Sequence, residues 1–312
     1  MKDWKISLGA ALGLMAMLAL MFFAFMAPAT ASGAKNLPLA VNAPAAVVEQ
    51  LEAAGTFTIT ETANSESATS LVENHEAIGG ISIDATGATI VTAQAAGSPY
   101  VTAMKTVGSK LEAQGIPVSY QEVAPYSDKD PSGIGMTLLA MPLALGGGVA
   151  GMIFTMLPGR RWVRAAMSVV ASIGFGFIIT AMLTGYGTIS GHFLATAAAL
   201  SFGIASIALW VQGMGALLGR AGAILAGPLF LLLLSNPLSA LSTGKWWLPS
   251  GWGEFGQWLP IGAIGNMIRS INFFPGASIT NNILAMLIFL ALGAAGLAIG
   301  SRKQKAAAPA TA

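Results

Sequence analysis

Long apolar runs recur along the chain, and one long polar stretch separates the first of them from the others. Six runs contain no Lys, Arg, Asp or Glu: 6–27, 133–157, 165–185, 193–218, 221–241 and 279–300. At a rise of 1.5 Å per residue, a helix of about 20 residues crosses the hydrocarbon core of a bilayer. Helices of soluble proteins seldom stay uncharged on every face for this length. The pattern therefore predicts an α-helical polytopic membrane protein with six transmembrane helices.

The stretch between the first two runs has a different pattern, in which strand-like and helix-like segments alternate. The strand-like segments are 37–42, 56–60, 81–84, 88–93 and a last one that begins at Val118. Helices are expected after Pro44 with Asn42 as the cap, after a cap at Ser65, and from Ser98 onward. We therefore predict an extracytoplasmic α/β domain at 33–131, inserted between an N-terminal helix in 1–32 and a five-helix membrane domain in 132–312.

Composition supports lipid as the solvent for much of this chain. Hydrophobic residues make up 54% of the sequence and charged residues only 9%, whereas soluble proteins are nearer a quarter charged. Cysteine is absent. This excludes a disulfide framework, a thiolate metal site and a cysteine nucleophile.

Basic residues are distributed unevenly among the connections, which sets the expected orientation. With a cytoplasmic N-terminus, the inner side has a net charge of +8 and the outer side −6. The inner basic residues are Lys2, Lys5, Arg160, Arg161, Arg164, Arg220, Arg302, Lys303 and Lys305. We expect a multi-pass protein of the plasma (inner) membrane, with both termini cytoplasmic and residues 33–131 outside.

The first run has a second interpretation. Ala29-Thr30-Ala31 is typical of a signal-peptidase site after a basic start and an apolar stretch. The run is 22 residues long, whereas signal peptides usually have an apolar core of about 7–15. A retained helix is therefore the preferred interpretation, and cleavage would leave five spans and the same exterior.

Four tryptophans lie close together between the last two runs, in the sequence GKWWLPSGWGEFGQWLPIG at 244–262. Tryptophan favours the membrane–water boundary, and backbone broken by Pro and Gly cannot face lipid unpaired. We predict that 244–275 forms short helices in the outer leaflet, as a re-entrant or interfacial segment; an ordinary ordered loop is the alternative. Candidate residues of a substrate path here are Trp252, Glu254, Trp258, Pro260 and Arg269. Glu254 and Arg269 either pair with each other or each reach lipid headgroups.

The motifs of common enzymes are missing. Gly244-Lys245 lacks the upstream glycine of a phosphate-binding loop and is followed by Trp. Of the two histidines, His75 is expected at a solvated helix end and His192 at a membrane boundary. We expect no catalytic residue, metal or cofactor, no enzymatic activity of this chain, and no nucleic-acid partner.

Glycine pairs four residues apart let helix backbones approach closely. They occur at Gly9/Gly13, Gly147/Gly151, Gly215/Gly219 and Gly296/Gly300. Packing within the chain is the expected role of each pair, and a subunit interface is the alternative.

The order of parts resembles the ABC-2 type membrane proteins, in the YhgE/Pip-like or actinobacterial ABC-transporter-permease-like branch. That order is one span, an exterior α/β domain, and five spans with a broken segment before the last. The matching words are NLPLAVNAP (36–44), HEAIGGI (75–81), TAQAAGSP (92–99), YSDKDPSGIG (126–135), NPLSAL (236–241), LP (248–249) and QWLPIGA (257–263), with the stretch from Arg269 to Phe274.

The resemblance implies a permease subunit that pairs with itself or a similar chain and is driven by a separate ABC ATPase. Its implied cargo is lipidic or amphiphilic. Arg160, Arg161 and Trp162 would then be the candidate ATPase contacts. The chain departs from the family in its short connection at 158–164 and in the few residues before its first span. The alternative function is a non-transporting envelope protein that displays 33–131 as a binding or scaffold module.

Overall fold

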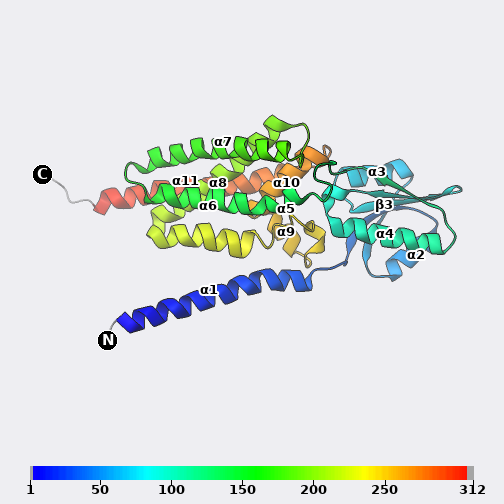
Figure 1. Ribbon diagram of the computed structural model, residues 1–312, viewed down its shortest axis with the longest axis horizontal. Helices are drawn as coiled ribbons and strands as arrows, with labels where there is room; N and C mark the ends of the chain where they lie inside the picture. Colours follow the sequence, from blue (N-terminus) through cyan, green and yellow to red (C-terminus); the bar gives the residue numbers. More distant parts are fainter. Residues whose placement is uncertain (1–2, 308–312) are drawn as a thin grey trace.

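The computed structural model describes residues 3–307 and places a helical bundle beside a small mixed sheet (Figure 1). Lys2 lies outside the described residues, and the side chains of Arg302, Lys303 and Lys305 lie outside the described side chains. Both termini are at the end of the bundle remote from the sheet (Figure 1). The side of a membrane on which this end lies stays a prediction.

Five helices in the described part of the chain are long and apolar enough to cross a membrane, which indicates a membrane-embedded protein. They are Ser7–Ala31, Ile134–Met156, Arg161–Gly185, Phe193–Ser235 and Thr280–Ser301. The fourth, at 43 residues, is about twice the length needed for one crossing.

A break at Gly219 divides that fourth helix. Within α8 (Phe193–Ile224), Gly219 has φ 68° and ψ −153°, which is not helical. Gly222 then lies directly against the carbonyl of Met214, so the chain turns back on itself. Two π-helical turns follow, Leu225–Leu229 and Leu231–Ser235, and Pro228 lies in the first. The break falls between the runs 193–218 and 221–241, and the count of six spans stays a prediction.

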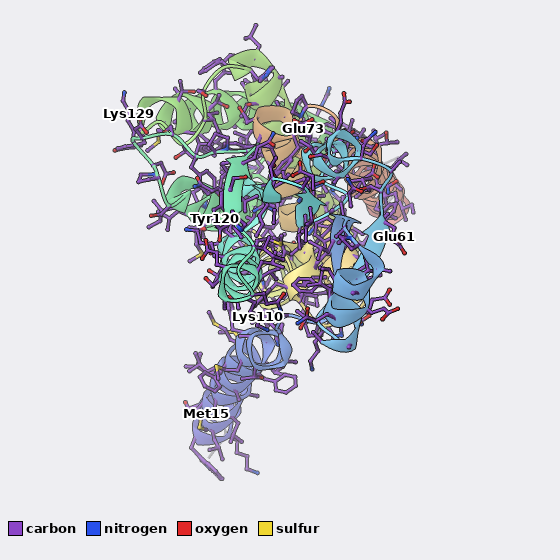
Figure 2. The ribbon with its side chains drawn as sticks, turned by 90° about the vertical axis from the view of Figure 1, so that its right-hand side faces the viewer. Met15, Glu61, Glu73, Lys110, Tyr120 and Lys129 are labelled. Carbon is purple, nitrogen blue, oxygen red and sulfur yellow. The ribbon has the colours of Figure 1, made fainter. Side chains whose placement is uncertain are left out.

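Helix α1 (Asp3–Ala31) lies apart from the long helices of the bundle and contacts the second π-helical turn, Leu231–Ser235. No residue of its most apolar window is buried. Figure 2, which looks along the long axis, shows Met15 on a helix that projects away from the rest of the molecule. Gly9 and Gly13 have no atom within 4 Å of an added Cβ, so the described chain supplies no packing partner for this pair.

The remaining long helices pack around α8. They are α6 (Ala140–Met156), which follows the short α5 (Ile134–Leu138), α7 (Arg161–Gly185) and α11 (Thr280–Ala307). Gly147 and Gly151 of α6 lie against Ile207 and Val211 of α8, and Gly296 and Gly300 of α11 lie against Gly213 and Ala216. Intrachain packing is thus confirmed for these two pairs, whereas Gly219 serves the chain reversal.

The α/β region, which we define as residues 37–122, follows α1 and precedes the bundle. Its strands are β1 (Leu37–Asn42), β2 (Phe57–Glu61), β3 (Gly79–Asp84), β4 (Gly87–Thr92) and β5 (Val118–Glu122). They form one sheet in the order β2-β1-β3-β4-β5. Only the β3–β4 pair is antiparallel. Each strand lies within two residues of the position that the alternating pattern predicts.

The helices of the region cover both faces of the sheet. They are α2 (Ala45–Ala53), α3 (Ser65–Glu73) and α4 (Ser98–Ala113). A Cβ on Gly79 would meet Met104 of α4, whereas one on Gly80 would meet Ala68 of α3. Because neighbouring strand residues face opposite ways, α3 and α4 lie on opposite faces. Right-handed crossovers require this arrangement and put α2 on the face of α4.

The predicted helix caps were wrong, although the helices begin close to the expected residues. Pro44 rather than Asn42 precedes α2, without a side-chain cap, because Asn42 still belongs to β1 and pairs with Ser82. Asn64 caps α3, and its side-chain oxygen accepts a hydrogen bond from the Ser67 amide at 2.7 Å. Both Ser and Asn cap helices well, so composition alone does not choose between neighbouring positions.

Candidate functional site

The tryptophan segment, which we define as residues 244–258, forms short helices between the π-helical turns and α10. A 3-10 turn covers Lys245–Trp247 and α9 covers Trp252–Gln257. Helix α10 (Pro260–Phe273) follows, with Pro260 buried at its first position, where no backbone donor is needed. The depth of these helices in a bilayer stays a prediction.

Trp246 and Trp247 pack against the α/β region. The amide of Trp247 donates to Tyr100 Oη at 3.1 Å, and its carbonyl accepts from the amide of Gly33 at 3.0 Å. Gly97, just before α4, lies against the residue that precedes the segment. Its φ is 152°, and an added Cβ would lie 2.5 Å from the carbonyl oxygen of Thr243. The segment is therefore fixed to the end of α1 and to the start of α4.

His75 lies at the centre of this contact and is only 8% exposed. Its ring stacks on Phe274 at 4.4 Å and meets Trp246 edge-on at 5.3 Å. Burial lowers the pKa of His75 well below its usual value, and the nearby charges of Arg269 and Lys245 lower it further. The imidazole is therefore neutral at pH 7.

The expectation of a solvated His75 was wrong. Helix α3 ends at Glu73, and His75 adopts a left-handed conformation with φ 56° that turns the chain inward. Its aromatic neighbours come from residues about 170 to 200 positions later in the chain, so local pattern does not predict them. We call His75, Tyr100, Trp246, Trp247 and Phe274 the aromatic junction.

Arg269 is buried beneath the aromatic junction and is 4% exposed. Its Nη2 donates to the carbonyl of Leu241 at 2.7 Å. Glu254 is exposed on α9 and makes no ion pair with Arg269 among the described residues. The predicted ion pair between Glu254 and Arg269 is therefore not seen. Arg269 lies on the buried side of α10, whereas Glu254 lies on the exposed side of α9.

The charge of Glu254 instead favours the protonated form of Lys245. Lys245 Nζ lies 4.4 Å from the centre of the Trp246 ring, a cation–π geometry. Burial lowers the pKa of Lys245, and the charge of Glu254 opposes that change. The two residues also line one small cavity with Trp246. The charge at this end of the segment thus stabilises a docked tryptophan.

The other two tryptophans face outward. Trp252 is 47% exposed and Trp258 is 42% exposed, and Phe255 between them is also exposed. The four tryptophans therefore divide into a docked pair and an exposed pair, a division that their spacing does not reveal.

Two cavities meet at Trp247. One, of about 540 Å³, is a groove between α2 and α4; we call it the α2–α4 groove. The second, of about 350 Å³, lies between the end of α1 and the loop 236–243; we call it the hydroxyl cavity. Its lining includes five residues that carry hydroxyl groups, Ser32, Thr137, Ser239, Ser242 and Thr243. Trp247 is part of the lining of both, so the two cavities adjoin the same residue.

The three candidate ATPase contacts lie at the other end of the bundle, between α6 and α7. Arg160 and Trp162 are exposed, whereas Arg161 is partly buried, with its Nη1 near Gly300 of α11. Arg164 donates to the carbonyls of Thr155 and Leu157, which are left free at the end of α6. Arg160 and Trp162 are thus available for contact, and Arg164 holds the turn together.

Within residues 3–307, no group of three or more His, Asp or Glu side chains has the arrangement of a metal site. The chain matches no protein-family model, no curated protein and no solved structure, so its resemblance to the ABC-2 type proteins stays a prediction.

Proposed function

We propose that the protein is the membrane subunit of an ABC-2 type exporter, that it moves a lipidic or amphiphilic molecule, and that a separate ATPase drives it. The observation that carries this proposal is the pair of cavities that meet at Trp247. One cavity adjoins the apolar helix α1 and the other lies in the α/β region. Such a pair suits a molecule that leaves a bilayer sideways and enters a water-exposed site.

The proposed topology has six spans, counting the two arms of the chain reversal at Gly219 separately. The termini and the loop with Arg160 would be cytoplasmic, and the α/β region would lie outside the plasma membrane. Their positions at opposite ends of the molecule support this orientation (Figure 1). The proposed assembly is a dimer of this chain or a pair with a similar chain.

A charge reversal at Arg160 tests the ATPase contact. Arg160 is exposed in the turn before α7, so Arg160→Glu is expected to abolish copurification of an ATP-binding chain from mild detergent without unfolding the protein. The matched control is Arg220→Glu, an exposed arginine in the other connection at this end. Topology is checked by protease accessibility in both variants, because loss of a basic residue alone can invert a membrane protein. Equal copurification with both variants would refute this contact.

A binding or scaffold module is the second candidate function, and the α2–α4 groove favours it because most of its lining belongs to the α/β region. This function predicts that no ATP-binding chain copurifies with the native protein under any mild condition. Stoichiometric recovery of such a chain would exclude it.

A further inference from the structure

We propose that the α2–α4 groove binds the alkyl chain of an anionic lipid taken from the adjoining leaflet, with its headgroup at Lys110. This inference deepens the proposed function by naming the class of its substrate and the place where that substrate first leaves the bilayer.

The wall of the groove is suited to an alkyl chain. Val47 and Leu51 of α2 face Ala103, Val107 and Leu111 of α4 across it. Its volume of about 540 Å³ lies within the range of about 300–1,000 Å³ found for small-molecule sites. An apolar lining of this size gains free energy when it excludes water, and an alkyl chain is the simplest occupant that does so.

The charged side chain of the groove and two amides lie toward one end, whereas Thr102 and Thr106 line α4 nearer the other end. Gln114 Nε2 donates to Gln50 Oε1 at 3.4 Å, a bond that links α4 to α2. Lys110 lies one turn before Gln114 and is also part of the lining. An ammonium group beside amide donors at one end of an apolar groove matches a phosphate headgroup on an alkyl chain.

The opposite end of the groove reaches the membrane helices. Ala34, three residues after α1, and Trp247 both line it there. Beyond Trp247 lies the hydroxyl cavity, whose lining includes Phe25 and Pro28 of α1. Helices α2 and α4 also lie on the flank of the molecule on which α1 projects (Figure 1, Figure 2). A lipid bound with its headgroup at Lys110 would therefore point its chain back toward the bilayer.

Photolabelling of the full chain in vesicles tests this site. The probe is a phosphatidylglycerol analogue with a diazirine in its acyl chain, and labelled peptides are identified by mass spectrometry. We expect labels on α2 and α4 in addition to the spans. Labels confined to the spans would overturn the proposal.

Two substitutions that fill the groove with a larger side chain test the site directly. Ala103→Trp and, on the opposite wall, Val47→Trp are expected to lower labelling of α2 and α4 at least about fivefold, the change that about 1 kcal/mol of lost binding produces. Ala113→Trp is the matched control, since Ala113 is exposed on α4 and outside the groove. If both variants remain monodisperse and the labelling of α2 and α4 is unchanged, the groove is not the lipid site.

The headgroup is tested by charge reversal. Lys110→Glu is expected to reduce labelling by the phosphatidylglycerol probe, whereas Lys105→Glu on the exposed part of the same helix is not. Equal labelling in these two variants would overturn the assignment of the headgroup to Lys110. A crosslink from α4 to a second protein chain in place of lipid would overturn the lipid assignment.

These outcomes are independent of the ATPase. Specific labelling without a copurifying ATPase would keep the lipid site and refute the exporter. A copurifying ATPase without groove labelling would keep the exporter and refute this site.

Discussion

At the scale of single residues, the aromatic junction depends on an imidazole that is buried without a charge partner. His75 stacks on Phe274, and its Nε2 makes no hydrogen bond with the described residues. Arg269 and Lys245 both place positive charge near it. A protonated imidazole would therefore be unfavourable here both for lack of solvent and for like-charge repulsion.

This environment predicts a dependence of stability on pH. The pKa of His75 is lowered in the folded protein, so the unfolded chain binds a proton at a higher pH than the folded chain does. Stability contributed by neutral His75 is fully present above about pH 6.5 and falls as pH drops below that value, by about 1.4 kcal/mol per unit of pKa difference. Thermal unfolding in detergent between pH 8 and pH 5 measures the effect.

A pair of variants separates His75 from the acidic groups that also titrate. His75→Phe keeps a ring against Phe274 and is expected to flatten the pH profile between 5 and 6.5. His192→Asn is the control, since His192 is exposed and is the other histidine of the chain. A profile for His75→Phe that matches that of the unchanged protein would contradict the prediction.

At the scale of elements, sequence pattern predicts structure well where the pattern is local. The spacing of Tyr100, Met104, Val107 and Leu111 predicts one buried face of α4, and all four are buried. The strict alternation at 56–60 predicts β2 with one exposed face, and Thr58 and Thr60 are exposed. Local contacts repeat with a fixed period, so they can be read without knowing the fold.

Contacts between distant elements leave no such periodic pattern in the sequence. The docked pair Trp246 and Trp247 and the exposed pair Trp252 and Trp258 have similar sequence surroundings, with Gly and Pro on either side. What distinguishes the docked pair is Tyr100. Its hydroxyl accepts a hydrogen bond from the Trp247 amide, although the two residues are 147 positions apart in the sequence. The sequence therefore places the candidate residues Trp252, Glu254, Trp258, Pro260 and Arg269 in one segment without predicting which of them are buried, and their part in a substrate path stays a prediction.

The docking of the tryptophan segment can be loosened by one methyl group. Gly97→Ala would place a Cβ 2.5 Å from the Thr243 carbonyl oxygen at a φ of 152°. We expect a loss of about 3 kcal/mol from strain and overpacking, together with faster proteolysis within 244–258.

Gly115→Ala is the matched control for this change. Gly115 also has a positive φ, of 83°, but nothing lies within 4 Å of an added Cβ. Its cost is expected to be about 1–2 kcal/mol, from backbone strain alone. Equal effects of the two variants on unfolding and on proteolysis would show that the contact with Thr243 contributes nothing.

At the scale of the whole molecule, α1 has an unusual position. Its apolar surface is almost entirely exposed, and Gly9 and Gly13 face open space. The glycine pairs of α6 and α11, by contrast, are filled by α8. The pair on α1 is therefore the one of these three that remains available to a second chain, as the proposed dimer requires.

Enlarging these glycines tests the dimer. Gly9→Ile with Gly13→Ile is expected to lower the dimer fraction in lipid nanodiscs, by about tenfold in the association constant if about 1.4 kcal/mol is lost. Gly174→Ile on α7 is the control, because Gly174 also has open space around it and lies on an apolar helix of membrane-spanning length. Chemical crosslinking gives the readout. An unchanged dimer fraction would remove α1 from the interface.

The link between Gly33 and Trp247 has a mechanical consequence. A spanning helix with few neighbours can adjust its tilt to the thickness of the bilayer around it. Helix α1 ends at Ala31, and two residues later the chain is bonded to the backbone of Trp247. If α1 spans the bilayer as proposed, a change in bilayer thickness that leans α1 over or draws it upright would pull on the backbone of Trp247, the residue that lines both cavities, so that the surrounding lipid would itself alter their shape.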